Sequence, residues 1–403
     1  MIPVLFAAIA SLGIAGDLRL DVEAEARSLA RSADYTEVDD VARIETTLVP
    51  RLALRTDGRL QVRLAWEPTM LLPVDVVGET IGLEGTIADR TILLHRVAAT
   101  GELALPRWRI LAGGSAQKGE TLLVADPAAG RVAQAVSTTA RLPYFGAEAN
   151  LGARWEPGQR TTLEWSVGAS QSGGEGTEGR TLLPRFRTVR AAAGARRNLD
   201  PRNEVGLELA GTRSRVGDSA ARDAGFLRGG ARWAHQATRH LDFRTAAGVA
   251  LTWERDLPDP EALEGVPPVL PWVEGSLGYA LEGSRPRFDL GVSVAPAVDR
   301  FRGTLDLLAS AWGAVGWSPF RRWTFGLRAS TASSFGWRGE QPEASEPHTM
   351  VHGATASASY RILDDVRLAA SAGTTWQITE REDLPTFRED LVTIEIVAAL
   401  FSL

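Results

Sequence analysis

The chain of 403 residues contains no cysteine, which excludes a disulfide framework, thiolate metal ligands and a cysteine nucleophile. The absence of thiols also suits a protein that passes through an oxidising periplasm. Lysine is nearly absent too, because Lys118 is the only one and all other basic residues are arginines. The formal net charge is −6, which argues against a nucleic-acid partner.

Long apolar runs are also missing beyond the N-terminus, and a transmembrane helix would need about 18 consecutive apolar residues. The N-terminus differs, because residues 2–15 are apolar and end at the small residues Gly13, Ala15 and Gly16. We interpret residues 1–16 as a signal peptide without the usual basic start. The alternative is a buried N-terminal helix. Residues 17–403 then form the mature domain.

The main positive signal is alternation of apolar and polar residues over segments of about ten to fourteen residues. For example, Val205, Leu207 and Leu209 alternate with Glu204 and Glu208. A period of two indicates a strand with one apolar and one polar face. We expect about eighteen such strands, at 17–29, 41–55, 59–70, 89–101, 106–116, 140–155, 160–171, 185–197, 204–215, 225–237, 241–254, 270–282, 286–297, 304–317, 322–334, 349–361, 365–378 and 389–402.

The connections between these segments alternate between short turns and longer polar loops. The longer loops are expected near 30–40, 71–88, 118–138, 172–184, 216–224, 256–269, 336–348 and 379–388. Short turns on one side and long loops on the other are typical of outer-membrane barrels, whose turns are periplasmic. An even strand count then places both termini in the periplasm. The strand number could be about 16 to 20. The least defined region is 118–142, whose residues could form a further hairpin or a loop folded into the lumen.

The tryptophans support a membrane barrel over a soluble sandwich, the alternative all-β fold. Aromatic residues concentrate at the two membrane interfaces, and a soluble sandwich has no reason to sort its tryptophans in this way. Five tryptophans lie near the short turns: Trp108, Trp155, Trp233, Trp317 and Trp323. Four lie near the long loops: Trp66, Trp253, Trp272 and Trp376. We therefore predict an all-β fold, a transmembrane antiparallel β-barrel in the outer membrane.

The polar face of the predicted strands carries charges of both signs. The candidates for lining the lumen are Arg43, Glu45, Arg63, Arg109, Glu148, Arg154, Glu164, Arg190, Glu208, Arg232, Arg244, Asp289, Arg328 and Arg361. Arg51, Glu67, Arg196, Glu204 and Arg228 are expected on the same face. These charges either pair across neighbouring strands or line a hydrated conduit, and the two interpretations are compatible. The presence of both signs argues against strong ion selectivity.

No pattern predicts catalysis, a metal site or a cofactor. The five histidines are scattered, and His348 and His352 fall at a loop-to-strand junction. Neither a nucleotide-binding loop nor a nucleophile elbow is present. We therefore expect a protein that is not an enzyme.

Four segments carry a resemblance to a known group of barrels. They are LLHR at 93–96, PRFR at 184–187, APAVDR at 295–300 and GWSPFRRWT at 316–324. The chain resembles the eighteen-stranded outer-membrane barrels of the myxobacterial exopolysaccharide-export type. That resemblance implies a partner, a short periplasmic polysaccharide-export protein, and a polysaccharide as the transported substrate. These motifs are structural turns, so the resemblance assigns no functional residue.

Three functions are compatible with these observations. The first is a conduit that exports a polysaccharide across the outer membrane together with the periplasmic partner. The alternative is a general or solute-selective diffusion porin for small hydrophilic nutrients, whose pore a loop such as 118–138 would narrow. A weaker third hypothesis is a surface adhesin that binds partners through its long loops.

Overall fold

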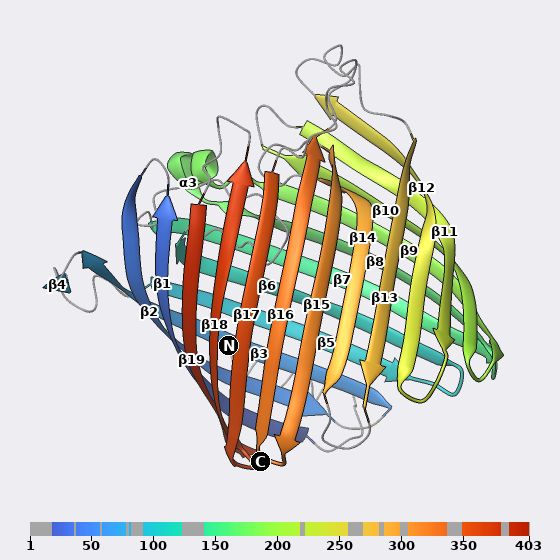
Figure 1. Ribbon diagram of the computed structural model, residues 1–403, viewed down its shortest axis with the longest axis horizontal. Helices are drawn as coiled ribbons and strands as arrows, with labels where there is room; N and C mark the ends of the chain where they lie inside the picture. Colours follow the sequence, from blue (N-terminus) through green and yellow to red (C-terminus); the bar gives the residue numbers. More distant parts are fainter. Residues whose placement is uncertain are drawn as a thin grey trace.

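The computed structural model is a wall of antiparallel strands rolled into a barrel (Figure 1). It describes residues 18–35, 38–56, 59–77, 80–81, 92–122, 141–217, 222–256, 269–281, 286–298, 305–336, 349–379 and 387–402. The predicted signal peptide, residues 1–16, lies outside these ranges, as does most of the 118–138 loop. No helix within the described ranges is long and apolar enough to cross a membrane.

The described residues form nineteen strands and the short helix α3 (Gly176–Leu182). The strands are β1 (Leu18–Tyr35), β2 (Val38–Thr56), β3 (Leu60–Val77), β4 (Thr80–Ile81), β5 (Ile92–Ala104), β6 (Trp108–Leu122), β7 (Arg141–Gly158), β8 (Thr161–Gly174), β9 (Phe186–Asp200), β10 (Asn203–Val216), β11 (Arg222–Gln236), β12 (Leu241–Asp256), β13 (Val269–Ala280), β14 (Arg287–Val298), β15 (Leu305–Phe320), β16 (Trp323–Gly336), β17 (Thr349–Leu363), β18 (Val366–Thr379) and β19 (Phe387–Ser402).

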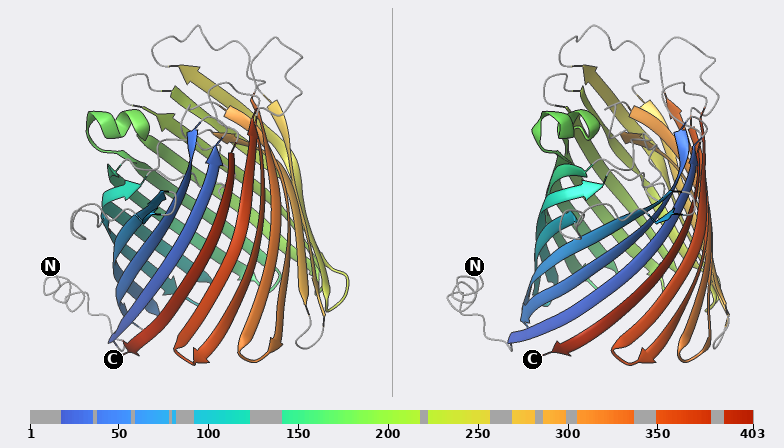
Figure 2. Two further views of the ribbon diagram at one scale, coloured as in Figure 1. Left: turned by 60° about the vertical axis from the view of Figure 1, so that its left-hand side comes forward. Right: turned by 90° about the vertical axis from the view of Figure 1, so that its left-hand side faces the viewer.

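The sheet closes on itself because β1 pairs with β2 on one side and with β19 on the other. The two-residue strand β4 pairs only with the end of β3, and β3 continues the wall to β5. The remaining eighteen strands therefore form the wall, as predicted from the sequence. Closure matters because lipid cannot hydrogen-bond the free N–H and C=O groups of a sheet edge. Both ends of the wall meet at one rim, where Asp21 lies opposite Ser402 (Figure 2).

The alternating apolar and polar residues of each strand lie on opposite faces of this wall. Leu207 and Val292 are 66% and 56% exposed, whereas the side chains of Arg228 and Glu208 on the opposite face are 23% and 21% exposed. Side chains diverge on the convex outside of a cylinder and crowd together on its concave inside. The apolar face is therefore the outer one, as a barrel in lipid requires.

The turn between β9 and β10 is typical of the short-turn end. The carboxylate Oδ1 of Asp200 accepts hydrogen bonds from the backbone N–H groups of Arg202 and Asn203, at 2.7 and 2.9 Å, and Asp–Pro sequences favour such turns. The side-chain amide of Asn203, followed by the Arg202 N–H, holds the pKa of Asp200 below its usual range. β1 begins and β19 ends at this same short-turn rim of the wall (Figure 2).

The first three strands run further than the sequence predicted. Residues 30–40 were expected as a loop, but β1 extends to Tyr35 and β2 begins at Val38. Likewise β3 extends to Val77, beyond its expected end at residue 70. Beyond the lipid a strand can continue in water without an apolar face, so alternation does not mark its end. The predicted loop at 172–184 also differs, because β8 runs to Gly174 and α3 follows it.

The barrel has a sharp crease at its long-loop end, around β12 and β13. Cα atoms of β11 and β14 come within 8 Å of each other although two strands separate them, whereas a flat sheet would hold them about 14 Å apart. At this crease a Cβ atom on Gly248 would lie 2.0 Å from the carbonyl oxygen of Gly229. Glycine therefore permits the close approach of the two backbones. Glu254 reinforces the crease, accepting a hydrogen bond from the backbone N–H of Leu305 at 3.2 Å.

Most of the predicted interface tryptophans lie on the outer face. Near the short turns, Trp108 stacks on Trp155 at 5.5 Å and meets Trp165 edge-on at 5.4 Å between ring centroids. At the opposite end, the Trp66 ring stacks on His95 at 6.3 Å.

The expectation for Trp272 was wrong. This tryptophan faces inward and is 1% exposed, because Gly248 on the adjacent strand β12 and Gly230 on the next strand, β11, leave a slot that its ring fills. Its Nε1–H donates to the carbonyl oxygen of Gly229 at 3.3 Å. Ala250 and Leu270 are buried on the same inner face, so the crease holds a small apolar core inside the barrel.

The assignment of the two faces predicts opposite outcomes for arginine at two adjacent positions. Val292→Arg places a charge against lipid and should lower the unfolding free energy by about 2–4 kcal/mol. Ser293 faces inward, where its hydroxyl meets that of Ser310 at 2.7 Å, so Ser293→Arg should cost less than about 1 kcal/mol. Urea titration of both variants in lipid vesicles measures the difference. Equal losses would show that the faces are wrongly assigned.

Candidate functional site on the inner wall

The candidate site is the charged inner face of the barrel, and the register places predicted residues from many strands on it. Glu148 and Glu164 share this face with ion-pair partners on neighbouring strands, as described below, and Arg63 lines a cavity on it. Arg43 and Glu45 take positions on β2, but their side chains are outside the part that the structure describes. Among the described residues, no group of three potential ligands could hold a metal ion.

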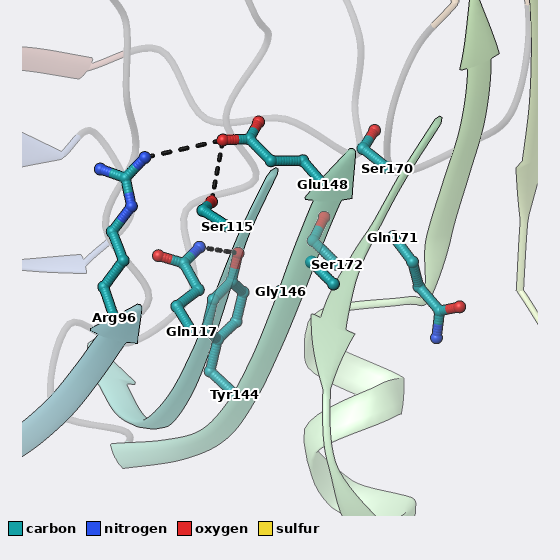
Figure 3. A pocket seen from close by; sticks show the side chains of 10 residues that line it. Arg96, Ser115, Gln117, Tyr144, Gly146, Glu148, Ser170, Gln171 and Ser172 are labelled. Atoms are coloured by element: carbon teal, nitrogen blue, oxygen red, sulfur yellow. Dashed lines mark hydrogen bonds and ion pairs between the residues drawn. The ribbon is translucent and has the colours of Figure 1, made fainter. Parts of the chain in front are cut away.

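A chain of alternating charges crosses the wall from β2 to β7. Arg51 Nε donates to Glu67 Oε1 at 2.7 Å, and Arg96 Nη1 lies 3.7 Å from Glu67 Oε2. The other amino group of Arg96 reaches over β6 to Glu148 Oε1, at 3.6 Å (Figure 3). Glu148 also accepts a hydrogen bond from Ser115 Oγ at 2.9 Å. Arg96 therefore joins two carboxylates from different strands into one network.

Two cavities open on either side of Arg96, which lines both. One has a volume of about 350 Å³ and is bounded by Ser115, Gln117, Tyr144 and Glu148 (Figure 3). Gln117 Nε2 donates to the Tyr144 hydroxyl across it, at 3.0 Å. The other cavity, of about 330 Å³, is bounded by residues that include Arg51, Arg63 and Glu67. Both surfaces combine hydrogen-bond donors and acceptors, so they can hold water or a polar solute.

A second network lies toward the short turns, on β7 to β10. Arg154 contacts Glu156 at 2.8 Å and Glu164 at 3.9 Å between nitrogen and oxygen. Arg196 binds the same Glu164 and lies 3.9 Å from Glu204. The predicted residues Arg154 and Glu164 are thus brought together. A cavity of about 500 Å³ beside the β9–β10 turn is lined by residues that include Arg196, Glu204, Arg232 and Arg244.

A third network lies at the crease and combines charge with an aromatic ring. Arg228 lies 3.6 Å from Glu208 and 2.8 Å from Glu274. Its guanidinium carbon also lies 4.6 Å from the ring centroid of Trp272, within the range of a cation–π contact. This arrangement holds the guanidinium against the inner wall.

The other predicted residues lie outside these three networks. Some form a single ion pair with a nearby residue, and others have no carboxylate partner among the described residues. Arg109 pairs with Glu102 at 2.9 Å, Arg244 lies 3.8 Å from Asp242, and Asp289 pairs with Arg287 at 2.9 Å. The Arg328 guanidinium lies 5.7 Å from the ring centroid of Trp312. Four further predicted arginines have no carboxylate partner in the described part of the chain: Arg63, Arg190, Arg232 and Arg361. Of the predicted set, the three networks therefore include Glu148, Arg154, Glu164 and Glu208.

The sequence missed Arg96, which is the centre of the first network. Residues 93–96 read Leu93, Leu94, His95, Arg96, so two apolar residues precede two polar ones and alternation is lost there. The structure resolves the register, since Arg96 lies opposite Glu67 on β3 and Gln117 on β6. Trp272 and Trp312 were missed as inner-face residues for a related reason, because an inward aromatic side chain violates the expected pattern.

These ion pairs contribute little to the stability of the barrel. Arg51, Arg96 and Glu148 retain 30%, 45% and 57% of their side-chain exposure, so water screens their attraction. Exposed pairs of this kind contribute about 0–1 kcal/mol each to stability. The networks therefore keep opposite charges close together and hydrated on the inner surface.

Comparisons with known proteins agree with this architecture. Neither a family model nor a curated protein sequence matches the chain. Among solved structures, Acinetobacter baumannii OccAB2 matches with a TM-score of 0.50 and 12% identity, covering 95% of this chain and 98% of that one. Pseudomonas aeruginosa OccK2 (OpdF) matches with a TM-score of 0.49 and 11% identity, over 94% and 98%. OccK2 has also been solved in complex with glucuronate.

The similarity to OccAB2 concerns the fold and assigns no residue role. The chain is an all-β barrel with the eighteen-stranded fold of the Occ structures.

The exposure of the first network predicts a graded response to loss of charge. Glu67 is 17% exposed and contacts two arginines, so Glu67→Gln should lower the unfolding free energy by about 1 kcal/mol. Glu148 is more exposed, and Glu148→Gln should have no measurable effect. Urea unfolding in vesicles compares the two variants. A loss above about 3 kcal/mol for both would mean that the pairs are structural and dry.

Proposed function

We propose that the chain is a passive outer-membrane channel for small hydrophilic solutes. The proposal rests above all on one observation, the partly exposed inner wall on which arginines lie beside carboxylates. Its networks pair arginines with carboxylates in several parts of the barrel, and their side chains stay partly exposed. Such a wall offers hydrogen-bond donors and acceptors that can replace the water molecules around a polar solute. It does not bind solutes of one charge sign strongly.

The lumen-lining role of the predicted residues is part of this proposal. The cavities beside Arg96 and beside the β9–β10 turn lie at different heights of the same inner wall. Each offers guanidinium donors and carboxylate acceptors within one cavity, which suits hydroxyl-rich or zwitterionic solutes. Weak, repeated contacts along a path favour passage, because a solute must leave each position as readily as it enters.

Single-channel recording tests the proposal directly. Purified protein in a planar bilayer should conduct ions, and in a salt gradient chloride and potassium should permeate almost equally. The double variant Glu67→Gln/Glu148→Gln removes two negative charges from the inner wall, so its reversal potential should shift toward chloride. Ser293→Gln adds no charge and is the matched control. Folded protein without conductance would overturn the proposal.

Export of a polysaccharide with a periplasmic partner remains the second candidate, implied by the sequence resemblance alone. A deletion strain separates the two. We expect slower uptake of small hydrophilic solutes with normal surface polysaccharide, restored by the gene in trans. Loss of exopolysaccharide with unchanged uptake would contradict the proposed channel and favour the export conduit.

A further inference from the structure

The outer face of the barrel carries an arginine patch at the long-loop ends of β9 and β10. We use this name for Arg187, Arg213 and Arg215, whose side chains are all exposed. They follow the apolar outer residues of the same two strands, since Val189, Leu207 and Leu209 are 53%, 66% and 51% exposed. The outer surface thus changes from apolar to basic within two residues along β9 and within four along β10.

The guanidinium of Arg213 is held in a defined orientation. Its Nε lies 3.0 Å from both carboxylate oxygens of Asp223 on β11, and its Nη2 also donates to that carboxylate. Asp223 is 9% exposed whereas Arg213 is 69% exposed. One edge of the guanidinium is therefore fixed against the wall, and its Nη1 has no partner in the described part of the chain.

The backbone around the patch is equally defined. Gly217, which follows β10, has a φ of 80°, a conformation that glycine adopts without strain. Its N–H donates to the carbonyl oxygen of Arg185 at 2.9 Å. This bond ties the end of β10 to the start of β9, and the register places Arg187 directly opposite Arg215.

The register also places the patch at the level of a membrane interface. Arg213 lies opposite Gly225, and Gly225 lies opposite Trp253. Trp253 is an outer-face tryptophan with 38% exposure, and such residues mark the boundary between lipid and headgroups. The long loops are at this end, so the boundary belongs to the outer leaflet.

We propose that the arginine patch binds the phosphate groups of the outer-leaflet glycolipid, lipid A. Among the described residues, Arg213 and Arg215 lie beside one carboxylate, that of Asp223, which leaves an excess of positive charge beside an anionic headgroup. Arginine forms bidentate, charge-assisted hydrogen bonds with phosphate. The apolar surface directly below accommodates the acyl chains of the same molecule, which is why the occupant is a lipid and not a free anion. The proposal is independent of what the channel transports.

Lipid retention measured on the intact barrel tests this proposal. The protein is reconstituted in phosphatidylcholine nanodiscs with lipid A or with dephosphorylated lipid A, in magnesium-free buffer, and bound lipid is counted by native mass spectrometry. Each arginine near an anionic headgroup contributes about fivefold in affinity. Arg215→Gln should therefore weaken lipid A binding about fivefold and Arg213→Gln/Arg215→Gln about twenty-fivefold.

The matched control is Arg197→Gln, which removes an exposed outward arginine from β9 near the periplasmic turn and should leave retention unchanged. Arg215 has no partner among the described residues, so its variant tests binding without disturbing the fold, which heat-modifiable gel migration verifies. Equal binding of dephosphorylated lipid A, or unchanged retention by the double variant, would overturn the proposal. Complete competition by millimolar inorganic phosphate would equally exclude the lipid as occupant.

Discussion

The structure depends on one constraint, the need to satisfy every backbone hydrogen bond inside a lipid layer. Water is absent there, so a sheet survives only if its first and last strands pair with each other. The pairing of β1 with β19 meets this requirement. Once the wall is closed, the position of a residue along its strand determines whether its side chain faces lipid or the lumen. Leu207 contacts lipid and its neighbour Glu208 contacts the lumen, although they are adjacent in the chain.

The same closure concentrates polar chemistry in a confined volume. Inward side chains converge, so arginines and carboxylates from strands far apart in sequence come within ion-pair distance. Arg96 and Glu148 meet across β6 in this way. At the crease the backbones approach so closely that Trp272 fills a slot beside glycines and lies against the guanidinium of Arg228. The inner wall therefore combines partly exposed charged side chains with a small apolar core at the crease.

The sequence predicted the fold well because the fold follows from a local rule. Alternation identified the strands and assigned Val292 outward and Ser293 inward, without any knowledge of which strands are neighbours. Contacts that depend on register could not be predicted in this way. Arg96 was missed because the residues before it break the alternation, and its partner Glu67 is set by the pairing of β3 with β5. Trp272 was placed at the interface because its inward slot is made by glycines of two other strands.

The seam between β1 and β19 has a consequence for how the barrel is made. It joins residues such as Asp21 and Ser402, which are separated by nearly the whole chain, whereas the other wall strands pair with sequence neighbours. The entropy lost on closing a loop grows with its length, and contacts between distant residues form slowly. The hairpins between sequence neighbours can therefore form first, and the pairing of β1 with β19 forms last. Until it forms, two unpaired strands stay open, and the folding machinery must shield them from other chains.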